Sequence, residues 1–306
     1  MTDPLGEALH FLRLTGVFYC RSELTAPWGV SLHAMPGYLW FHVVTSGRCV
    51  LEVDGTEPHV LLPGDLALVP HGEGHRMRSE PGVPTPRIDQ LPHDYETDRY
   101  AILRYGEGGA ESTLVCGAVR IEHPAAHHLL ALLPHIVHLE PSDGPQTDWL
   151  NSTVRLLAAE ARTLRPGGET VITRLSDLLI IQTIRTWIEH DPAARTGWLG
   201  ALKDPQIGRA ISLIHADPAR PWTVAALAGE LAMSRSAFAA RFTELVNEPA
   251  MQYVTRWRMQ VARDWLHQDG ATVATIANRL GYQSEAAFSR AFKRVVGISP
   301  GAVRRT

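Results

Sequence analysis

Apolar and polar residues alternate in three different ways along this chain of 306 residues. Up to about residue 122, short β-type runs are separated by glycine and proline, at residues 37–44, 47–53, 59–62 and 65–69. Many short strands at this spacing predict a β-sandwich or barrel, with the Asp54-Gly55 pair as a hairpin turn. Residues 83–112 are polar and rich in proline and glycine, so we expect a long loop there, either a flexible flap or disordered.

After residue 124 the pattern becomes helical. Apolar side chains recur at steps of three and four over residues 129–137, 149–164 and 170–188, which predicts three helices. The last of these segments is apolar over a wide face. It therefore needs a partner surface, which is either the β-domain or a second copy of the chain.

One pattern occurs twice in the last hundred residues, at an offset of 49 or 50 residues. In each copy a threonine precedes a short amphipathic helix and a serine precedes a second one, which is the usual place of a capping residue. The second helix carries two phenylalanines four residues apart, which predicts a buried face. The residues concerned are Thr223, Ser234, Phe238 and Phe242 in the first copy, and Thr272, Ser284, Phe288 and Phe292 in the second. Each copy thus has the pattern of a helix-turn-helix unit, whose second helix enters the major groove of DNA.

Residues 249–267 predict a single long helix between the two units, with apolar residues at steps of three and four. A helix of roughly 18 residues spans about 27 Å. It can therefore hold two recognition helices near one DNA turn apart, so that one chain reads two successive segments of the groove.

The charge of the chain is divided in the way that a DNA-binding region requires. Residues 205–306 hold 13 Arg and Lys and 7 Asp and Glu, a net charge of +6, whereas residues 1–204 hold 16 and 25, a net charge of −9. Because binding to phosphates is largely electrostatic, a basic module that coincides with the repeated motif indicates a DNA-binding protein.

Residues 207–306 resemble the AraC/XylS family of bacterial regulators, including the closing segment Gly297-Ile-Ser-Pro-Gly-Ala-Val-Arg-Arg. The resemblance implies a sequence-specific transcription regulator that binds double-stranded promoter DNA, with RNA polymerase as a further partner. It also implies a homodimer formed by the helices that follow the β-domain, and an activator, although the residues alone leave activation and repression open.

A second resemblance concerns residues 64–75, Gly-Asp-Leu-Ala-Leu-Val-Pro-His-Gly-Glu-Gly-His, which are similar to the second sequence motif of cupin barrels. AraC-type regulators commonly carry such a barrel as a sensor of a small effector. The segments Phe18-Tyr-Cys20, Phe41-His42 and Leu114-Val-Cys116-Gly resemble a cupin-bearing subgroup of them. We therefore expect an α+β protein with a cupin-like β-barrel over residues 1–123, a helical linker and dimerisation region over 124–204, and an all-α double helix-turn-helix domain over 205–306.

The candidate DNA-contacting residues lie on the helix faces opposite the phenylalanines. They are Ser234, Arg235, Ser236, Ala239, Ala240, Ser284, Glu285, Ala286, Ser289, Arg290, Lys293 and Arg294. Arg235 and Arg290 are the first candidates for a base edge or an adjacent phosphate, because a guanidinium pairs bidentately with guanine. Lys293 and Arg294 are expected to contact phosphates. The structural alternative is that each is an ordinary solvated charge.

Four residues of the β-domain are candidates for sensing the effector: Cys20, His42, His75 and Cys116. Metal-binding cupins supply His-x-His and a Glu from their first motif, but here Val44 stands two residues after His42 and no Glu follows shortly. A divalent ion such as zinc would need His42, His75 and a thiolate such as Cys20 or Cys116 as ligands. Oxidant sensing at Cys20 is another alternative, since its neighbour Arg21 is expected to lower the pKa of the thiol. The structural alternatives are a turn-capping His75 and small buried cysteines.

Location and enzyme activity are the remaining questions. No apolar run approaches the roughly 20 residues of a membrane span, and the first residues lack a basic and then apolar signal. We therefore expect a cytoplasmic protein, in which three cysteines do not form a disulfide framework.

The alternative to a regulator is a cupin metalloenzyme, an isomerase or dioxygenase with a fused helical domain. The missing first-motif ligands count against it, and we expect no enzyme activity.

Overall fold

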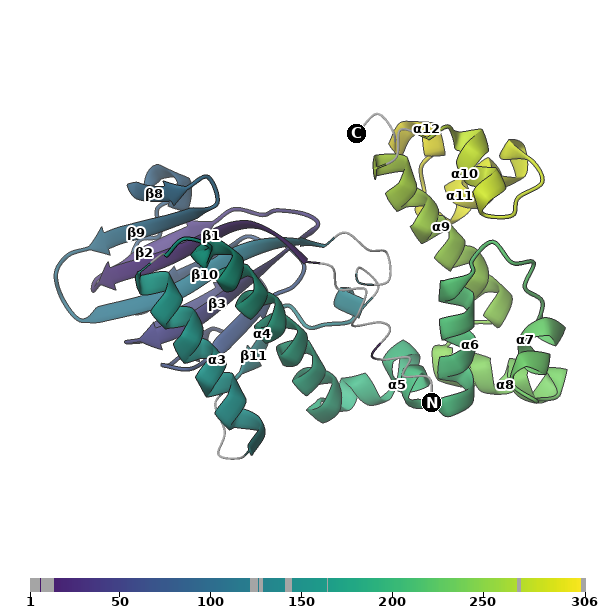
Figure 1. The fold of residues 1–306 in the computed structure, drawn as a ribbon, viewed down its shortest axis with the longest axis horizontal. Coiled ribbons are helices and arrows are strands. Elements are labelled where there is room, and N and C mark those ends of the chain that lie inside the picture. Colours follow the sequence, from purple (N-terminus) through teal and green to yellow (C-terminus); the bar gives the residue numbers. More distant parts are fainter. Residues whose placement is uncertain are drawn as a thin grey trace. The chain divides into compact units, whose positions relative to one another are not determined.

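The computed structural model describes residue 6 and residues 14–121, 126, 129–140, 145–163, 165–268 and 271–303. The chain forms two compact units, one from residues 13–121 and 127–189 and the other mainly from residues 190–306. Figure 1 labels their elements. The predicted α+β class is confirmed, since the first unit is built on sheets and the second on helices.

Two β-sheets form the first unit. The larger has the strand order β11-β6-β3-β10-β1-β9-β8 and the smaller the order β2-β7-β4-β5. Neighbouring strands are antiparallel, except that β1 and β9 are parallel. The bounds are β1 Leu14–Thr25, β2 Gly29–Leu32, β3 Tyr38–Ser46, β4 Cys49–Val53, β5 His59–Leu61, β6 Leu66–Val69, β7 His75–Arg78, β8 His93–Thr97, β9 Tyr100–Gly106, β10 Glu111–Ile121 and β11 Val137–Leu139.

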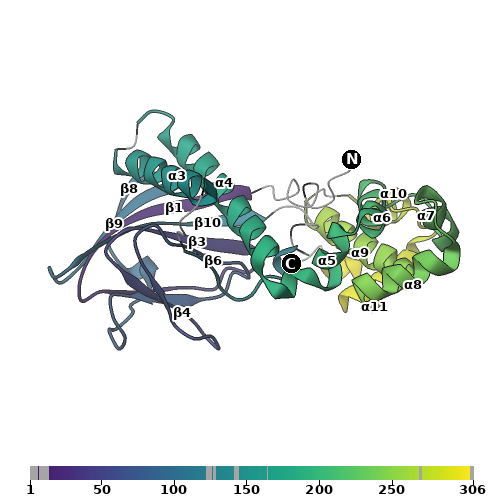
Figure 2. The same ribbon diagram turned by 90° about the horizontal axis from the view of Figure 1, so that it is seen from below.

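The larger sheet is covered on both faces, which explains its long apolar runs. Helices α3 (Pro145–Arg162) and α4 (Gly168–His190) lie over its outer face, as Figure 2 shows. The Tyr100 hydroxyl donates to the Ala161 carbonyl oxygen at 2.7 Å and joins β9 to the end of α3. On the inner face, side chains of both sheets share one apolar core. Hence residues 39–44 of β3 are all buried instead of alternating, as expected for a strand enclosed on two sides.

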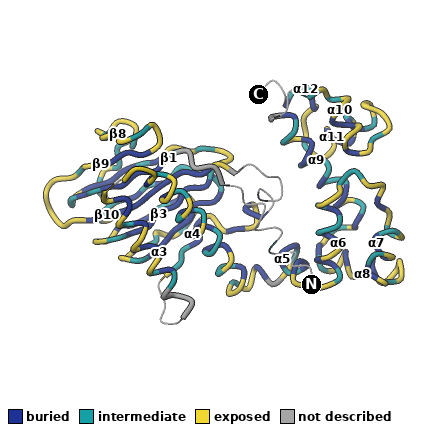
Figure 3. The backbone as a smooth tube through the Cα atoms, in the orientation of Figure 1, coloured by how far each residue is buried: buried dark blue, intermediate teal, exposed yellow. Residues whose placement is uncertain are grey.

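The prediction of a loop at residues 83–112 is wrong. This segment forms a 3-10 turn at Ile88–Gln90 and then the hairpin of β8 and β9. Strand β9 is stabilised by parallel pairing with β1, which is distant in sequence, and its residues 100–103 are buried. Strand β8 lies at the sheet edge with exposed polar residues, yellow in Figure 3, so its composition resembles that of a loop.

Of the three helices predicted after the β-domain, the second and third are confirmed as α3 and α4. The first, over residues 129–137, is wrong. Among the described residues of this stretch only the beginning is helical, and residues 137–139 form strand β11, which pairs with β6. Pro134 lacks an amide hydrogen and ends a helix, and the open edge of β6 offers backbone partners instead.

The second unit is helical. Its elements are a 3-10 turn at Pro192–Arg195, α5 Gly197–Lys203, α6 Pro205–Ala216, α7 Val224–Glu230, α8 Arg235–Val246, α9 Ala250–Gln268, α10 Val273–Arg279, α11 Glu285–Val296 and α12 Pro300–Val303. Helix α5 is part of this unit, because the indole Nε1 of Trp198 donates to the Tyr253 hydroxyl of α9 at 2.8 Å. The residues predicted as one connecting region are thus divided, with α3 and α4 in the first unit and α5 in the second.

Candidate nucleic-acid interface and candidate effector cavity

The two copies of the repeat form the same local structure, beginning with their capping residues. The Thr223 hydroxyl accepts a hydrogen bond from the Ala226 amide at the start of α7, at 3.0 Å. The Ser234 hydroxyl does the same for Ala237 at the start of α8, at 3.2 Å. In the second copy Thr272 caps α10 and Ser284 caps α11, with distances of 3.1 and 3.2 Å. The predicted capping residues are therefore confirmed. Each accepts a hydrogen bond from a backbone amide in the first turn of its helix, an amide that has no partner within the helix.

The phenylalanine pairs position both recognition helices. Phe238, Phe242, Phe288 and Phe292 are all completely buried. Within each pair the ring centroids lie 5.6 and 5.7 Å apart, a packing distance for tilted aromatic rings. Because these side chains lock one face of α8 and α11 into the core, the opposite faces of the two helices point away from it.

The predicted DNA-contacting residues lie on those opposite faces. All twelve are exposed or partly exposed, with Ala239 and Ser289 in the partly exposed group. Arg235, Arg290, Lys293 and Arg294 form no ion pair with a carboxylate of the described residues. Other arginines of this unit are engaged, since Arg241 pairs with Asp204. The unpaired cations on α8 and α11 are thus available to phosphates and bases.

Helix α9 joins the two helix-turn-helix units, as predicted. It has 19 residues and is therefore about 28 Å long. Val254, Trp257 and Val261 are buried along it, but Trp265 is only partly buried and lies under the guanidinium of Arg279, at 4.0 Å.

In the first unit, three of the predicted sensor residues form one row across the larger sheet. Cys20 of β1 is the cross-strand partner of Cys116 in β10, and Cys116 is the partner of His42 in β3. Partners in a row point to the same face, and Cys20 and Cys116 belong to the core between the sheets. The prediction that His42 faces inward is confirmed by its complete burial.

His42 meets the fourth predicted residue, His75, which comes from the smaller sheet. The two Nε2 atoms are 2.8 Å apart, and His75 Nδ1 donates to the Glu73 carbonyl oxygen at 3.0 Å. Since a carbonyl only accepts, His75 Nε2 is the acceptor of a proton held on His42 Nε2. His42 Nδ1 then carries a lone pair, and it has no partner among the described residues.

Burial keeps both histidines neutral. It lowers the pKa of His75 to about 4 and that of His42 well below its ordinary value, with the neighbouring His75 acting in the same direction on His42. The pair therefore joins the two sheets as uncharged rings, and Trp40 packs edge-on against His75 at a centroid distance of 5.7 Å.

The expectation of a reactive thiol at Cys20 is wrong. Burial raises the pKa of Cys20 to about 11, that of Cys49 to about 12, and that of Cys116 well above its ordinary value. Arg21 does not lower the pKa of Cys20, because adjacent residues in a strand point to opposite faces. The side chain of Arg21 lies on the outer face, where it contacts Glu23 and the end of α3. All three cysteines are free and buried, as in the structural alternative.

The predicted metal ligands are not assembled. Over the part of the chain that the structure describes, no three His, Cys, Asp or Glu side chains form a group that could hold a metal ion. His42 and His75 use their facing nitrogens on each other, and Cys20 lies two strands from His42 with a protonated thiol. These residues do not fit a cupin metal centre, which needs at least three ligands.

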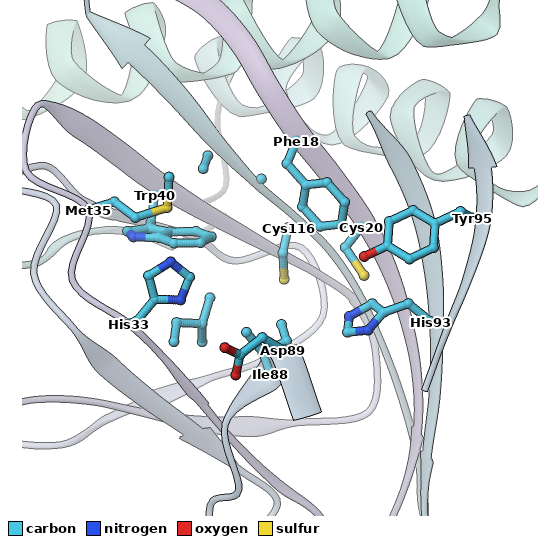
Figure 4. A pocket seen from close by; sticks show the side chains of 13 residues that line it. Phe18, Cys20, His33, Met35, Trp40, Ile88, Asp89, His93, Tyr95 and Cys116 are labelled. Carbon is cyan, nitrogen blue, oxygen red and sulfur yellow. The ribbon is translucent and has the colours of Figure 1, made fainter. Parts of the chain in front are cut away.

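A cavity of about 260 Å³ lies between the two sheets (Figure 4). It is lined by Phe18, Cys20, Leu32, His33, Met35, Trp40, Ile88, Asp89, His93, Tyr95, Cys116, Gly117 and Ala118. Of the four predicted sensor residues, Cys20 and Cys116 line this cavity with their sulfur atoms. His42 and His75 are not among its lining residues, although His75 contacts the lining residue Trp40. Most of the wall is apolar.

Sequence reasoning missed the wall formed by residues 88–95, because this segment was predicted to be a loop. It contributes Asp89 and His93 to the cavity, which is also lined by His33. Asp89 is held by Arg87, whose Nε and Nη2 donate to its two oxygens at 3.0 and 2.7 Å, and this contact lowers the pKa of Asp89. His93 Nδ1 donates to the Leu91 carbonyl oxygen at 2.9 Å, which leaves Nε2 as an acceptor. The apolar run at 100–103 after these residues is the signal that predicts a strand there.

Comparisons with known proteins identify the family of both parts of the chain. The sequence profile of a cupin family matches residues 3–189, and that of a helix-turn-helix domain matches residues 227–306. An AraC-like transcription regulator of Streptomyces lividans is 36% identical over 99% of this chain and 98% of its own. The transcriptional regulator AlkR of Acinetobacter baylyi is 28% identical over 97% of each chain. The activator RclR of Escherichia coli, named as specific for RCS, is 28% identical over 86% of this chain and 83% of its own.

The chain belongs to the AraC family of transcription regulators, with a cupin domain before the DNA-binding domain. It is a DNA-binding regulator and not an enzyme. Among the described residues, none of the helices is long and apolar enough to cross a membrane.

Proposed function

We propose that this regulator reads promoter DNA with α8 and α11, acts there together with RNA polymerase, and is controlled by a small effector bound in the cavity of the cupin domain. The observation that carries the proposal is the pair of capped recognition helices with matching buried phenylalanines and unpaired cations on their outer faces. In this proposal residues 1–123 bind the effector, the helices of residues 124–204 form the dimer, and residues 205–306 bind DNA.

For DNA recognition, we expect that Arg290→Ala weakens binding of the full chain to its site by about 1–3 kcal/mol, because a bidentate contact to a base is lost. DNA from upstream of the chain's own gene is the target, in a gel-shift titration at two salt concentrations. Affinity should fall steeply with salt, since cations released from phosphates drive binding. Arg209→Ala, an exposed arginine on α6, serves as the matched control. Equal affinities of the two variants would contradict the assignment of Arg290.

The cavity supports a small, mainly apolar effector with one polar group directed to Asp89 and His93. A volume of about 260 Å³ is less than that of pockets for drug-sized ligands and more than that of a 150 Å³ cavity that holds benzene. One or two rings therefore fit between Trp40 and Phe18. Recognition by Cys20 and Cys116 would rest on contact with their uncharged thiols.

Ala118 lines the cavity and is almost completely buried, so Ala118→Leu is expected to fill part of it. With p-cresol and toluene as probes, we expect the quenching of tryptophan fluorescence by either probe to require at least tenfold more probe in the variant. Its affinity for DNA without probe should be unchanged. Val60→Leu, on the exposed face of β5, is the control. Unchanged quenching in Ala118→Leu, or an equal reduction of quenching in Val60→Leu, would show that the effector binds elsewhere.

A homodimer through the helices of residues 124–204 is supported by apolar side chains that the first unit leaves in solvent. Leu156 of α3 is 60% exposed, and Val171 and Leu178 of α4 are 44% and 41% exposed. Val171, Leu175 and Leu178 recur at steps of four and three and so share one face of α4. A second copy of the chain would cover this face.

Sedimentation at micromolar concentration tests the homodimer. We expect a dimer for the natural chain and a monomer for Leu178→Glu, because a charge would be buried without a partner. Val60→Glu makes the same kind of change at an exposed residue of the smaller sheet and should leave the dimer intact. A natural chain that sediments as a monomer, with and without DNA, would contradict the proposal.

A further inference from the structure

A second cavity, of about 410 Å³, is lined by residues of β1, β3 and β10 of the larger sheet and of helix α3. Three arginines line it, Arg21 from β1 and Arg155 and Arg162 from α3. Three hydroxyl side chains, Thr45, Ser46 and Thr113 of β3 and β10, also line it, together with the apolar Val115 and Ala158. It shares no lining residue with the cavity between the sheets.

Strand register explains why these groups meet. Arg21 is the cross-strand partner of Val115, and the next residue on the same face, Glu23, is the partner of Thr113, which in turn pairs with Ser46. These two rows face outward, toward α3. Arg155 and Arg162 are seven residues apart and therefore lie on one face of that helix, two turns from each other.

Arg21 is the buried member of the cluster. Its side chain is only 9% exposed, and it pairs with Glu23 at 2.8 Å. Its Nη1 donates to the Arg162 carbonyl oxygen at the end of α3, at 3.1 Å, where a positive charge is favoured by the helix dipole. Its Nε is buried and has no hydrogen-bond partner among the described residues. A buried donor left unpaired is costly, so this side chain has an unused capacity for an acceptor.

The charges around the cavity do not balance. Arg155 and Arg162 are exposed and form no ion pair with a described carboxylate. The acidic residue nearest to Arg21, Glu23, is shared with Arg104, and Glu160 of α3 pairs with Arg165. Three guanidinium groups against one shared carboxylate leave the cavity with a charge of about +2.

We infer that this cavity is a second effector site, which binds a small organic dianion. Guanidinium groups recognise carboxylates and phosphates by paired hydrogen bonds, and the hydroxyls of Ser46 and Thr113 add donors for the remaining oxygens. The Thr45 hydroxyl already donates to the Thr113 carbonyl oxygen at 3.0 Å. Both a phosphate monoester and a dicarboxylate have this chemistry. The site is independent of the proposed effector in the other cavity.

Such a ligand would join the sheet to helix α3. Arg21 belongs to the sheet and Arg155 and Arg162 to the helix, so an anion between them contacts both elements. Ligand binding to the folded chain alone stabilises it. Helix α3 also carries the exposed Leu156 of the proposed dimer face. A dianion that holds α3 against the sheet would therefore fix where this face lies on the first unit.

The test is isothermal titration calorimetry of the full chain with inorganic phosphate and, separately, with malonate, at an ionic strength held constant with sodium chloride. We expect saturable binding of at least one of the two. Arg155→Gln with Arg162→Gln should weaken it at least tenfold, since both side chains are exposed and their exchange leaves the fold intact. Arg174→Gln, an exposed arginine of α4 that pairs with Asp177, is the matched control and should bind as the natural chain does.

Each outcome decides the inference. Binding of phosphate alone identifies a phosphate ester, and binding of malonate alone a dicarboxylate. No saturable binding of either anion overturns the proposal, and so does binding that the double variant retains. Arg21→Gln should abolish binding as well. If Arg21→Gln does not fold, the double variant Arg155→Gln with Arg162→Gln, which changes only exposed side chains, tests the site. Ala118→Leu should bind the anion normally, which separates this site from the cavity between the sheets.

Discussion

Replacing Phe292 by alanine is expected to lower the free energy of unfolding of the helical unit by about 3–5 kcal/mol. Phe292 is completely buried and contacts Phe288 on the same face of α11, so its removal leaves a cavity that rigid neighbours do not fill. Since domains are stable by only about 5–15 kcal/mol, much of the stability of the unit is lost. Urea denaturation followed by the helical circular dichroism signal measures the change, and specific DNA binding should fall with it.

Val295→Ala is the matched control on the same helix. Val295 is 39% exposed, so its truncation should change the free energy of unfolding by less than about 0.5 kcal/mol. Phe242→Ala, the equivalent change in the first copy of the motif, should behave as Phe292→Ala does. Equal midpoints of denaturation for Phe292→Ala and Val295→Ala would show that α11 does not depend on its buried face.

The second large effect is a loss of stability of the cupin unit in acid. Burial lowers the pKa of His75 from its ordinary value of 6.5 to about 4, so the unfolded chain takes up a proton before the folded one does. The stabilisation is therefore complete above pH 6.5 and is lost as the pH falls toward 4. For His75 alone the loss amounts to about 3 kcal/mol. His42, whose pKa is also lowered, adds to it in the same direction.

Urea denaturation of the natural chain and of His75→Leu between pH 7.5 and pH 4 tests this expectation. Carboxylates titrate over part of this range in both proteins, so the difference between the two pH dependences reports on the histidine. We expect the variant to be less stable at pH 7.5, because His42 loses its partner, and to lose less stability in acid. Parallel pH dependences would mean that His75 is not held neutral.

Helices α5, α6 and α12 of the second unit were not predicted from the sequence, whereas the helix-turn-helix region was. Its helices begin at Thr223, Ser234, Thr272 and Ser284, and both the capping bonds and the spacing of the phenylalanines depend on residues three and four positions apart. Such contacts depend only on residues that are close in the sequence. The pattern also occurs twice, so each copy supports the interpretation of the other. The outer faces of α8 and α11 follow from the same periodicity.

In the cupin domain the sequence predicted the strands near the second cupin motif, and the inward position of His42. It did not predict the strands β8, β9 and β11. Strands β9 and β11 are stabilised by partners far along the chain, β1 and β6, and β8 is a polar edge strand that pairs with β9. Asp89 and His93 of the effector cavity were missed because they lie in the polar segment 83–112, which was predicted to be a loop.

The chemistry of Cys20 shows most clearly what only the tertiary structure decides. Along the chain Arg21 is its immediate neighbour, which predicts a lowered pKa of the thiol. In the sheet the two side chains point to opposite faces, and the face that receives Cys20 is closed by the second sheet. Burial therefore determines the pKa of Cys20, while Arg21 belongs to the cavity under α3. Periodicity determines which residues share a face, but the layers packed on that face determine which groups meet there and how strongly they are removed from water.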